Sequence, residues 1–533
     1  MRFKDTSWYF LAILYCQFFS TSSQSSSESL YYVGAVVEYH PIHGLSETAA
    51  FSNIENYITI LKKAKELNSN LDIIVYPETG ILIESEDEIF LSIEEKRNRY
   101  LSLAPIVPDI SKKIIPCEME NSNISMALKK LSCAAKQYNA YLVVNYIEKE
   151  DCNNCGGDNK NLYNSNIIFD RNGTIISRYR KYNLFQEFSF NITHEPDISI
   201  FETDFGVKFG HFICFDILFE TPALELLRKH KITDIVYPTH WFGELPFLDA
   251  LSVQAAWSYA NDVNLLASGF NNPTTGSTGS GIFTGKYSKI PGLIHADRKK
   301  NALLITNIPK VIQGQRNVTN FEKILYQFTN NEMPTIDNDT SHSGFLTDFL
   351  SSFTTISIRP ETDKFVTLCK NNFCCHLNYK AEHNETIGEE EEYYRYRFGI
   401  FAGVRSYGVV NAGVEVCGLM ICGNDSLSSC GKQLDRNNIK FRTNFLKIQI
   451  TTTVAKRENS LINMPISLQN DFTPLDPENF SLESIDLENF KILSLNFKGT
   501  EKNLMSFGIY SRNFSADGNA LTIHESSSSK FFF

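Results

Sequence analysis

The sequence lacks a long apolar run anywhere after its first twenty residues. A helix that crosses a bilayer needs about 20 predominantly apolar residues in succession, and no segment beyond Phe19 reaches that length. The C-terminal end reads SSSSKFFF, whereas a glycolipid-anchor signal needs an apolar tail of about 10 to 20 residues. We therefore expect neither a transmembrane segment nor such an anchor.

The sequence also has fewer basic than acidic residues. The chain has 50 Lys and Arg against 61 Asp and Glu, a net charge of -11 and a pI of about 5.6. Proteins that bind nucleic acid or an anionic membrane surface usually carry a basic excess on the binding face. The charge balance therefore argues against either partner.

The N-terminal segment resembles an export signal. Arg2 and Lys4 precede an apolar run at residues 8–19, and small residues follow at 20–29. This order is typical of a secretory signal peptide, which we place at residues 1–22; a buried first helix is the alternative, but nothing amphipathic follows it. Nine Asn-x-Ser/Thr sequons agree with a secreted, N-glycosylated protein: Asn123, Asn172, Asn191, Asn317, Asn338, Asn384, Asn424, Asn479 and Asn513.

The cysteine count predicts one unpaired thiol. Twelve cysteines less Cys16 of the signal peptide leave eleven, and an odd number in an oxidising compartment leaves one without a partner. Cys214 is the expected one, because it has no cysteine near it in sequence. The other ten fall into three groups: Cys117 with Cys133; Cys152 with Cys155, expected as a local disulfide rather than a zinc site; and Cys369, Cys374, Cys375, Cys417, Cys422 and Cys430.

Strand and helix patterns alternate over residues 30–310, which predicts an α/β layered domain. Helices are expected at 52–67, 124–138 and 246–260, and Asn172-Gly173 predicts a β-hairpin. Residues 311–344, rich in Asn, Thr and Asp, are expected to form a linker. Short β-rich runs then predict a second, mostly β domain at 345–520.

Three polar residues occur where strands are expected to end. Cys214 interrupts GHFICFDILF, Glu78 closes the run in VYPETG, and Lys181 follows the hairpin in RYRKYNLF. A thiol exposed at a strand end, at the start of a helical turn, is favoured as thiolate; with a carboxylate and an ammonium group beside it, it can act as a nucleophile on a carbonyl. Taken singly, the three also fit a turn carboxylate, a surface charge and an inert core thiol.

Together these residues resemble the nitrilase, or carbon-nitrogen hydrolase, superfamily. The stretches YPETG, RKYNLF, ICFDILF, DIVYPTHW, NLLASGF, GSGIF and CCHLNY are similar to its vanin and biotinidase branch, over about residues 30–510. The resemblance implies a four-layer α-β-β-α sandwich followed by a β-rich C-terminal domain. It implies no metal and no cofactor.

The resemblance also implies roles for individual residues. Glu78 would be the general base and Cys214 the nucleophile, while Lys181 and the amide of Phe215 would hold the oxyanion. Glu187 is the nearest match to a further glutamate that nitrilases often have, although it lies closer to Lys181 than expected.

Two further residues are expected near the substrate pocket. His240 stands where this branch more often has a small residue, and Trp241 follows it. A hydrogen-bonded loop histidine and a core aromatic are the alternative interpretations of this pair.

The expected activity is hydrolysis of a linear, small-molecule amide through a Cys thioester. By resemblance the substrate would be pantetheine, cleaved to pantothenate and cysteamine, or a biotin amide. Transfer of the acyl group to an amine is a second possibility, and a non-catalytic secreted interaction protein is a third. The sequence leaves the oligomeric state open.

Overall fold

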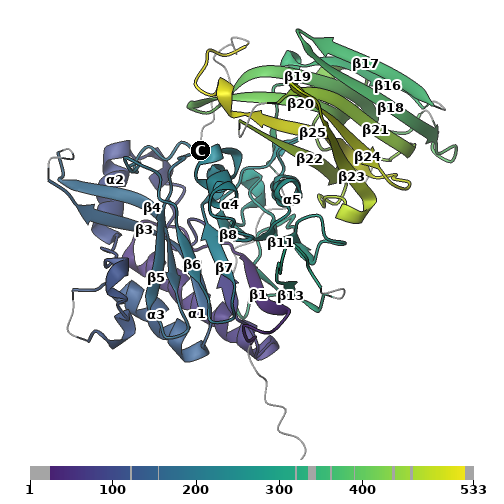
Figure 1. Cartoon of the computed structure of the whole chain (residues 1–533). Coiled ribbons are helices and arrows are strands. Elements are labelled where there is room, and N and C mark those ends of the chain that lie inside the picture. The colour runs from purple at the N-terminus through teal and green to yellow at the C-terminus, as the bar shows by residue number, and fades with distance from the viewer. Residues whose placement is uncertain are drawn as a thin grey trace, which may run out of the picture.

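The computed structural model describes residues 25–522 except 121–122, 154, 156, 318–320, 334–343, 361–362, 389, 435–438 and 457–459. The expected signal peptide at residues 1–22, the sequon at Asn338 and the C-terminal SSSSKFFF lie outside the described residues. The chain forms two parts, an N-terminal α/β part and a C-terminal part made almost entirely of strands (Figure 1).

Two sheets form the centre of the N-terminal part. The first has seven strands in the order β14 (Lys323–Gln327), β13 (Ala302–Pro309), β1 (Tyr31–Glu38), β2 (Ile73–Val75), β3 (Tyr141–Asp151), β4 (Lys160–Phe169) and β5 (Ile175–Arg180). The second has six strands in the order β12 (Gly292–Ile294), β11 (Ser280–Thr284), β10 (Asn264–Gly269), β8 (Asp234–Thr239), β7 (Lys208–His211) and β6 (Ile200–Glu202).

The two sheets pack face to face and helices cover their outer faces. Val36, Val143, Val236 and Leu266 belong to one apolar cluster that joins the sheets. The first sheet packs outward against α1 (Glu47–Leu67) and α3 (Met126–Tyr138), and the second against α5 (Ala250–Asn261). Two shorter helices, α2 (Ile93–Leu103) and α4 (Glu225–Arg228), complete this part. The expected four-layer α-β-β-α sandwich is thus confirmed.

Local sequence explains most of these elements, but all three expected helices begin away from their expected starts, α3 at Met126 rather than at residue 124. Strands such as β1 and β8 are apolar along nearly their whole length because both of their faces are covered. Helix α1 begins earlier than expected, since the Ser46 side chain accepts a hydrogen bond from Ala49 N and caps it. Helix α5 begins later than residue 246, because Asp249 supplies its cap.

The C-terminal part is a sandwich of two five-stranded sheets. One sheet has the order β16 (Thr354–Ile358), β19 (Arg395–Tyr407), β20 (Val410–Cys422), β25 (Leu504–Asn513) and β22 (Leu461–Gln469). The other has the order β17 (Lys364–Lys370), β18 (Phe373–His383), β21 (Thr443–Ala455), β24 (Phe490–Phe497) and β23 (Phe480–Asp486). Alternate residues of β18 are buried, as expected for a strand with one face in an apolar core.

The stretch expected as a linker, residues 311–344, is only partly one. It contains β14, which pairs with β13 and extends the first sheet, so that a plain linker is the wrong description of this segment. Just after it, β15 (Leu346–Thr347) pairs with β9 (Glu244–Leu245) of the N-terminal part. The chain is therefore joined to the N-terminal part by main-chain pairing before the second sandwich begins.

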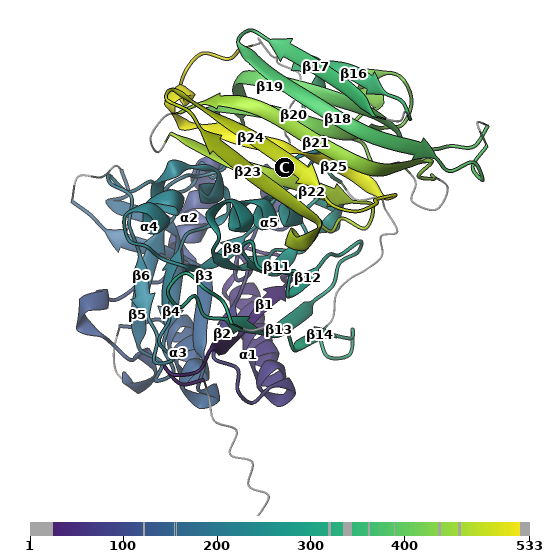
Figure 2. The same cartoon turned by 45° about the vertical axis from the view of Figure 1, so that its right-hand side comes forward.

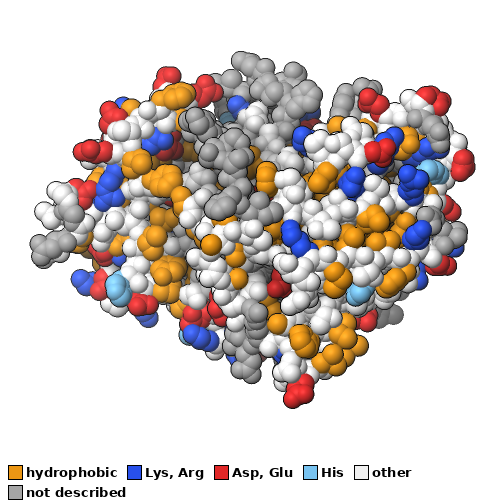
Figure 3. All heavy atoms as spheres, turned by 90° about the horizontal axis from the view of Figure 1, so that it is seen from above, with side chains coloured by type: hydrophobic (Ala, Val, Ile, Leu, Met, Phe, Trp, Pro, Cys, Tyr) orange, Lys and Arg blue, Asp and Glu red, His pale blue; other side chains and the backbone are white. Residues whose placement is uncertain are grey.

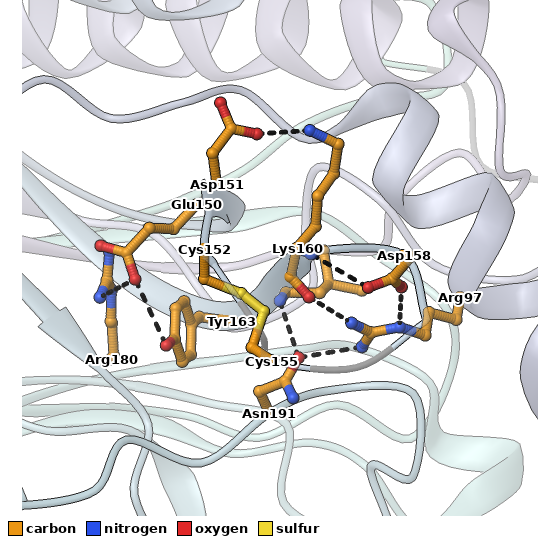
Figure 4. Close-up of a disulfide and its surroundings, with 11 residues drawn as sticks. Arg97, Glu150, Asp151, Cys152, Cys155, Asp158, Lys160, Tyr163, Arg180 and Asn191 are labelled. Atoms are coloured by element: carbon orange, nitrogen blue, oxygen red, sulfur yellow. Dashed lines mark hydrogen bonds and ion pairs between the residues drawn. A yellow bond between two sulfur atoms is a disulfide. The ribbon is translucent and has the colours of Figure 1, made fainter.

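Five disulfides account for all described cysteines except Cys214. They join Cys117 with Cys133, Cys152 with Cys155, Cys369 with Cys374, Cys375 with Cys417 and Cys422 with Cys430. The expected grouping and the expected free thiol are both confirmed. Figure 4 shows the Cys152–Cys155 disulfide in the β3–β4 loop, near Arg97, which bonds to Asp158 and to Asn191.

Within the described part of the chain, no helix is both long enough and apolar enough to cross a membrane.

The two parts share one apolar core. Figures 1 and 2 show the second sandwich above α5, with β22 nearest that helix, and Met464 and Ile466 of β22 share a buried cluster with Leu251 and Trp257 of α5. A charged contact adds to this interface. Arg405 of β19, 13% exposed, lies 2.7 Å from Glu244 and 3.0 Å from Asp348.

Removing the Arg405 side chain should destabilise this interface. Arg405→Ala leaves two nearly buried carboxylates without their cation, which costs about 3 kcal/mol of unfolding free energy near pH 8. Burial raises the pKa of Asp348 to about 7, so this carboxyl is protonated at lower pH and the cost should shrink at pH 5.5. Urea unfolding at both pH values measures the difference.

Arg395→Ala is the matched control for that measurement. Arg395 also pairs with a carboxylate, 2.7 Å away on Asp425, but the two side chains are 39% and 82% exposed. An exposed pair of this kind contributes at most about 1 kcal/mol. Equal losses for the two variants would show that burial of the Arg405 pair is unimportant.

Candidate active site

Glu78, Lys181 and Cys214 lie at strand ends that meet where the two sheets face each other. Glu78 follows β2, Lys181 directly follows β5, and Cys214 follows β7 of the other sheet. The three side chains are nearly buried, at 2%, 2% and 4% exposure. The structure thus brings together the three residues that the sequence places far apart.

Lys181 lies between two carboxylates. Its Nζ is 2.7 Å from Glu78 Oε1 and 2.5 Å from Glu187 Oε2. Burial alone favours the neutral amine, but the charges of Glu187 and Glu78 outweigh it and raise the pKa of Lys181 well above its ordinary value. The ammonium group therefore persists, and Glu187 belongs to the cluster despite its short separation from Lys181 in sequence.

Asn164 of β4 connects the same two carboxylates. Its Nδ2 donates to Glu78 Oε1 at 2.8 Å and to Glu187 Oε1 at 2.6 Å. Asn145 in turn donates to Asn164 Oδ1 at 2.6 Å, which fixes the orientation of the Asn164 amide. Burial raises the pKa of Glu78 despite the opposing effect of Lys181. Glu78 is accordingly a stronger base than an exposed glutamate.

Cys214 opens the short helical turn η4 (Cys214–Leu218) in a left-handed conformation, with φ of 46°. Asp216 holds this turn by accepting hydrogen bonds from Ile213 N at 3.0 Å and from Tyr179 Oη of β5 at 2.8 Å. Tyr237 Oη of β8 donates to Cys214 O at 2.7 Å. The nucleophile candidate is thus fixed by side chains from both sheets.

The expectation of an exposed sulfur that favours the thiolate is wrong. Cys214 is buried, and burial raises the pKa of its thiol, with the Glu78 carboxylate adding to the effect and Lys181 opposing it. Because η4 is a single turn, its dipole is too small to offset this desolvation. The resting group is therefore a neutral thiol that needs a base.

His240, the residue directly after β8, contacts both Glu78 and Cys214 through its main chain. Its N–H donates to Glu78 Oε2 at 2.7 Å, and its carbonyl oxygen accepts from Cys214 Sγ at 3.4 Å. The His240 ring stacks on Phe270 with centroids 3.9 Å apart. His240 is therefore in the site, as the sequence suggested for this position.

Phe215 contacts the loop that carries Glu187, whereas Trp241 is packed in the apolar core. Phe215 follows the thiol and contacts Phe185 of the loop that carries Glu187, with ring centroids 5.1 Å apart. Trp241 is 8% exposed in the core of the N-terminal part, and its Nε1 donates to Leu248 O at 2.9 Å. Its indole N–H is thus bonded within the fold.

The second sandwich also reaches the site. Tyr407, at the end of β19, packs against Phe215 with ring centroids 5.9 Å apart. The next residue, Gly408, lies so close to Gln186 that an added Cβ would be 2.8 Å from Gln186 Nε2. The β19–β20 hairpin therefore contacts both the residue after the thiol and the loop that carries Glu187.

Sequence reasoning missed Asn164 and Tyr407. Asn164 had a usable signal, because an amide side chain in the buried strand NLYNSNIIF needs a specific hydrogen-bond partner. Tyr407 had none, since its contact depends on how the two parts pack.

Comparison with known proteins identifies the families that both parts of the chain match. Residues 35–257 match the family model described as Carbon-nitrogen hydrolase, and residues 343–517 match the Vanin C-terminal domain. Vanin-like protein 1 of Drosophila melanogaster is 33% identical over 91% of this chain and 86% of its own length.

Two mouse enzymes are similar as well. Pantetheinase of Mus musculus is 32% identical over 69% of this chain and 68% of its own length. Biotinidase of Mus musculus is 31% identical over 78% of this chain and 83% of its own length. The chain therefore belongs to the vanin family of carbon-nitrogen hydrolases and is a hydrolase of carbon-nitrogen bonds other than peptide bonds.

Proposed function

We propose that this enzyme is a secreted amidohydrolase that cleaves pantetheine to pantothenate and cysteamine, with Cys214 as nucleophile. The observation that carries the catalytic proposal is the ammonium group of Lys181, held between Glu78 and Glu187 beside a lone buried thiol. A thiol, a base and a cation are the groups that acyl transfer through a thioester requires. The similarity to a pantetheinase supports this substrate.

In the first half of the proposed reaction, Glu78 accepts the thiol proton as Cys214 Sγ attacks the amide carbon. The negative charge on the former carbonyl oxygen is stabilised by Lys181 and by the main-chain N–H of Phe215. When the carbon-nitrogen bond breaks, Glu78 gives the proton to the departing amine. Burial raises the pKa values of both the Cys214 thiol and the Glu78 carboxyl, so the base that receives the proton is itself stronger than an exposed glutamate.

In the second half, water replaces the amine. Glu78 takes a proton from water, and the hydroxide attacks the thioester carbon. Collapse breaks the carbon–sulfur bond and releases the free acid, and Glu78 returns its proton to the sulfur to restore the Cys214 thiol. The net reaction is amide plus water to acid plus amine. Glu187 holds Lys181 Nζ in place through the 2.5 Å ion pair.

A biotin amide is the second candidate substrate. The mouse biotinidase aligns with 78% of this chain, against 69% for the mouse pantetheinase, at nearly equal identity. Either amide is a small molecule.

The surface charge gives no support for a polyanionic partner. Figure 3 shows basic and acidic side chains interspersed over the described part of one face, whereas binding of a polyanion to that face would require a broad basic area.

Secretion is supported by independent features. Residues 1–22 have the order of a signal peptide, and five disulfides occur in the described part of the chain. Disulfides at this density are typical of an oxidising compartment.

The substrate proposal is tested by incubating the purified protein with pantetheine and with biocytin. Pantothenate and biotin are measured by mass spectrometry, and we expect pantothenate. Cys214→Ala and Glu78→Gln should each lower kcat/KM by about 1,000-fold. Glu202→Gln, which alters an exposed ion pair with Lys208, should leave it unchanged. Release of biotin alone would favour the second candidate, and release of neither product would exclude both.

The reactivity of Cys214 should depend on pH in a defined way. Because burial raises the pKa of this thiol, the thiolate fraction grows about tenfold per pH unit well above neutrality. The iodoacetamide labelling rate of the native protein should therefore keep rising to at least about pH 9. Cys214→Ala gives the background rate. A plateau near pH 7 would show a thiolate in the resting enzyme.

Glycan occupancy should follow exposure of the sequons. Asn172 and Asn384 are exposed, whereas Asn513 is 8% exposed and its Nδ2 donates to Glu415 at 3.1 Å. We expect glycans at the first two positions and none at Asn513 in protein secreted from cultured cells. Enzymatic deglycosylation in water labelled with a heavy oxygen isotope, followed by peptide mass analysis, reads out each site. A fully occupied Asn513 would contradict this.

A further inference from the structure

Main-chain contacts of His240 with Glu78 and Cys214 place this residue, and with it the imidazole ring, in the site. The N–H of this residue binds Glu78 at 2.7 Å and its carbonyl oxygen faces Cys214 Sγ at 3.4 Å. Phe270 stacks on the imidazole with an interplanar angle of 17°, and Phe242 packs with its ring centroid 4.6 Å away. The ring is therefore held in one orientation next to the nucleophile.

The hydrogen bonds of Thr79 favour one of the two neutral tautomers of His240. Thr79 Oγ1 donates to the main-chain oxygen of Glu78 at 2.8 Å, and a carbonyl oxygen can only accept. The hydroxyl has a single proton, and with that proton donated to Glu78 O the imidazole is the donor in the 3.0 Å contact between Thr79 Oγ1 and His240 Nδ1. Burial lowers the pKa of His240 to about 3, and a neutral imidazole has only one N–H. Nε2 is thus an acceptor.

This acceptor is buried and has no hydrogen-bond partner among the described residues. A buried polar atom without a partner is unfavourable, and supplying a donor recovers the lost interaction. The Cys214 thiol is directed at the His240 carbonyl oxygen. A thioester formed on that sulfur therefore lies beside His240, whose main chain contacts the thiol.

We propose that His240 is a specificity-determining residue whose Nε2 accepts a hydrogen bond from an N–H or O–H group on the acyl part of the substrate. The inference rests on the proposed Cys214 thioester. It favours amides with such a donor a few bonds from the scissile carbonyl, as in N-acyl-β-alanyl amides. It disfavours acyl chains that are purely hydrocarbon in that region, such as the side chain of biotin.

Two fluorogenic substrates test this directly. The aminomethylcoumarin amides of N-acetyl-β-alanine and of 5-oxohexanoic acid differ only in one N–H replaced by CH₂. The wild-type enzyme should favour the N–H substrate in kcat/KM by about tenfold, the effect of one hydrogen bond to a buried acceptor. The ratio does not depend on the concentration of active enzyme, so partial misfolding of a variant does not alter it.

A matched pair of substitutions at His240 distinguishes loss of substrate recognition from a structural effect of the mutation. His240→Asn retains a donor for Thr79 but has no acceptor where Nε2 lies, and the ratio should fall to about one. His240→Gln can place Oε1 at the position of Nε2 and should retain most of the preference.

Two outcomes would overturn the inference while leaving amide hydrolysis intact. One is a wild-type ratio near one, which needs no variant to fold. The other is an unchanged ratio in His240→Asn. Failure of the wild-type enzyme to cleave either amide, with no labelling of Cys214 by them, would instead overturn the proposed thioester chemistry and the role of His240 with it.

Discussion

The ion pairs of one buried ammonium group govern the geometry of the site. Glu78 and Glu187 are 2% and 18% exposed at the side chain, and both approach Lys181 to within 2.7 Å. Without this cation, two carboxylates bonded to the same Asn164 amide would repel each other in a region of low dielectric. The sandwich can bury these carboxylates only because a lysine directly follows β5.

Burial also determines how the thiol can react. A cysteine at a helix start is often activated by a lowered pKa, but here the surroundings of Cys214 raise it. In the proposed mechanism activation comes from proton transfer to Glu78, whose own pKa is raised by the same burial. Such a site keeps its nucleophile protonated, and hence less open to oxidation, until a substrate is bound. This property suits a free thiol in an enzyme proposed to be secreted.

The parts of this site that sequence alone predicts are those that follow from local pattern or from the number of cysteines. An odd number of cysteines identifies Cys214, and strand-end positions identify Glu78 and Lys181. The burial of the thiol and the role of Asn164 depend on how two sheets pack face to face, which no local pattern encodes. For the same reason β14 was expected as part of a linker, since its pairing with β13 is a tertiary contact.

His240 shows how substrate preference can vary without disturbing the catalytic groups. Its contacts with Glu78 and Cys214 use only the main-chain N–H and carbonyl oxygen, which every residue except proline possesses. The side chain at this position is therefore under no constraint from those two bonds. A small residue leaves space beside the thiol, whereas histidine fills it with a stacked ring and one fixed acceptor. Changes here should alter which acyl groups bind while the positions of Glu78 and Cys214 stay the same.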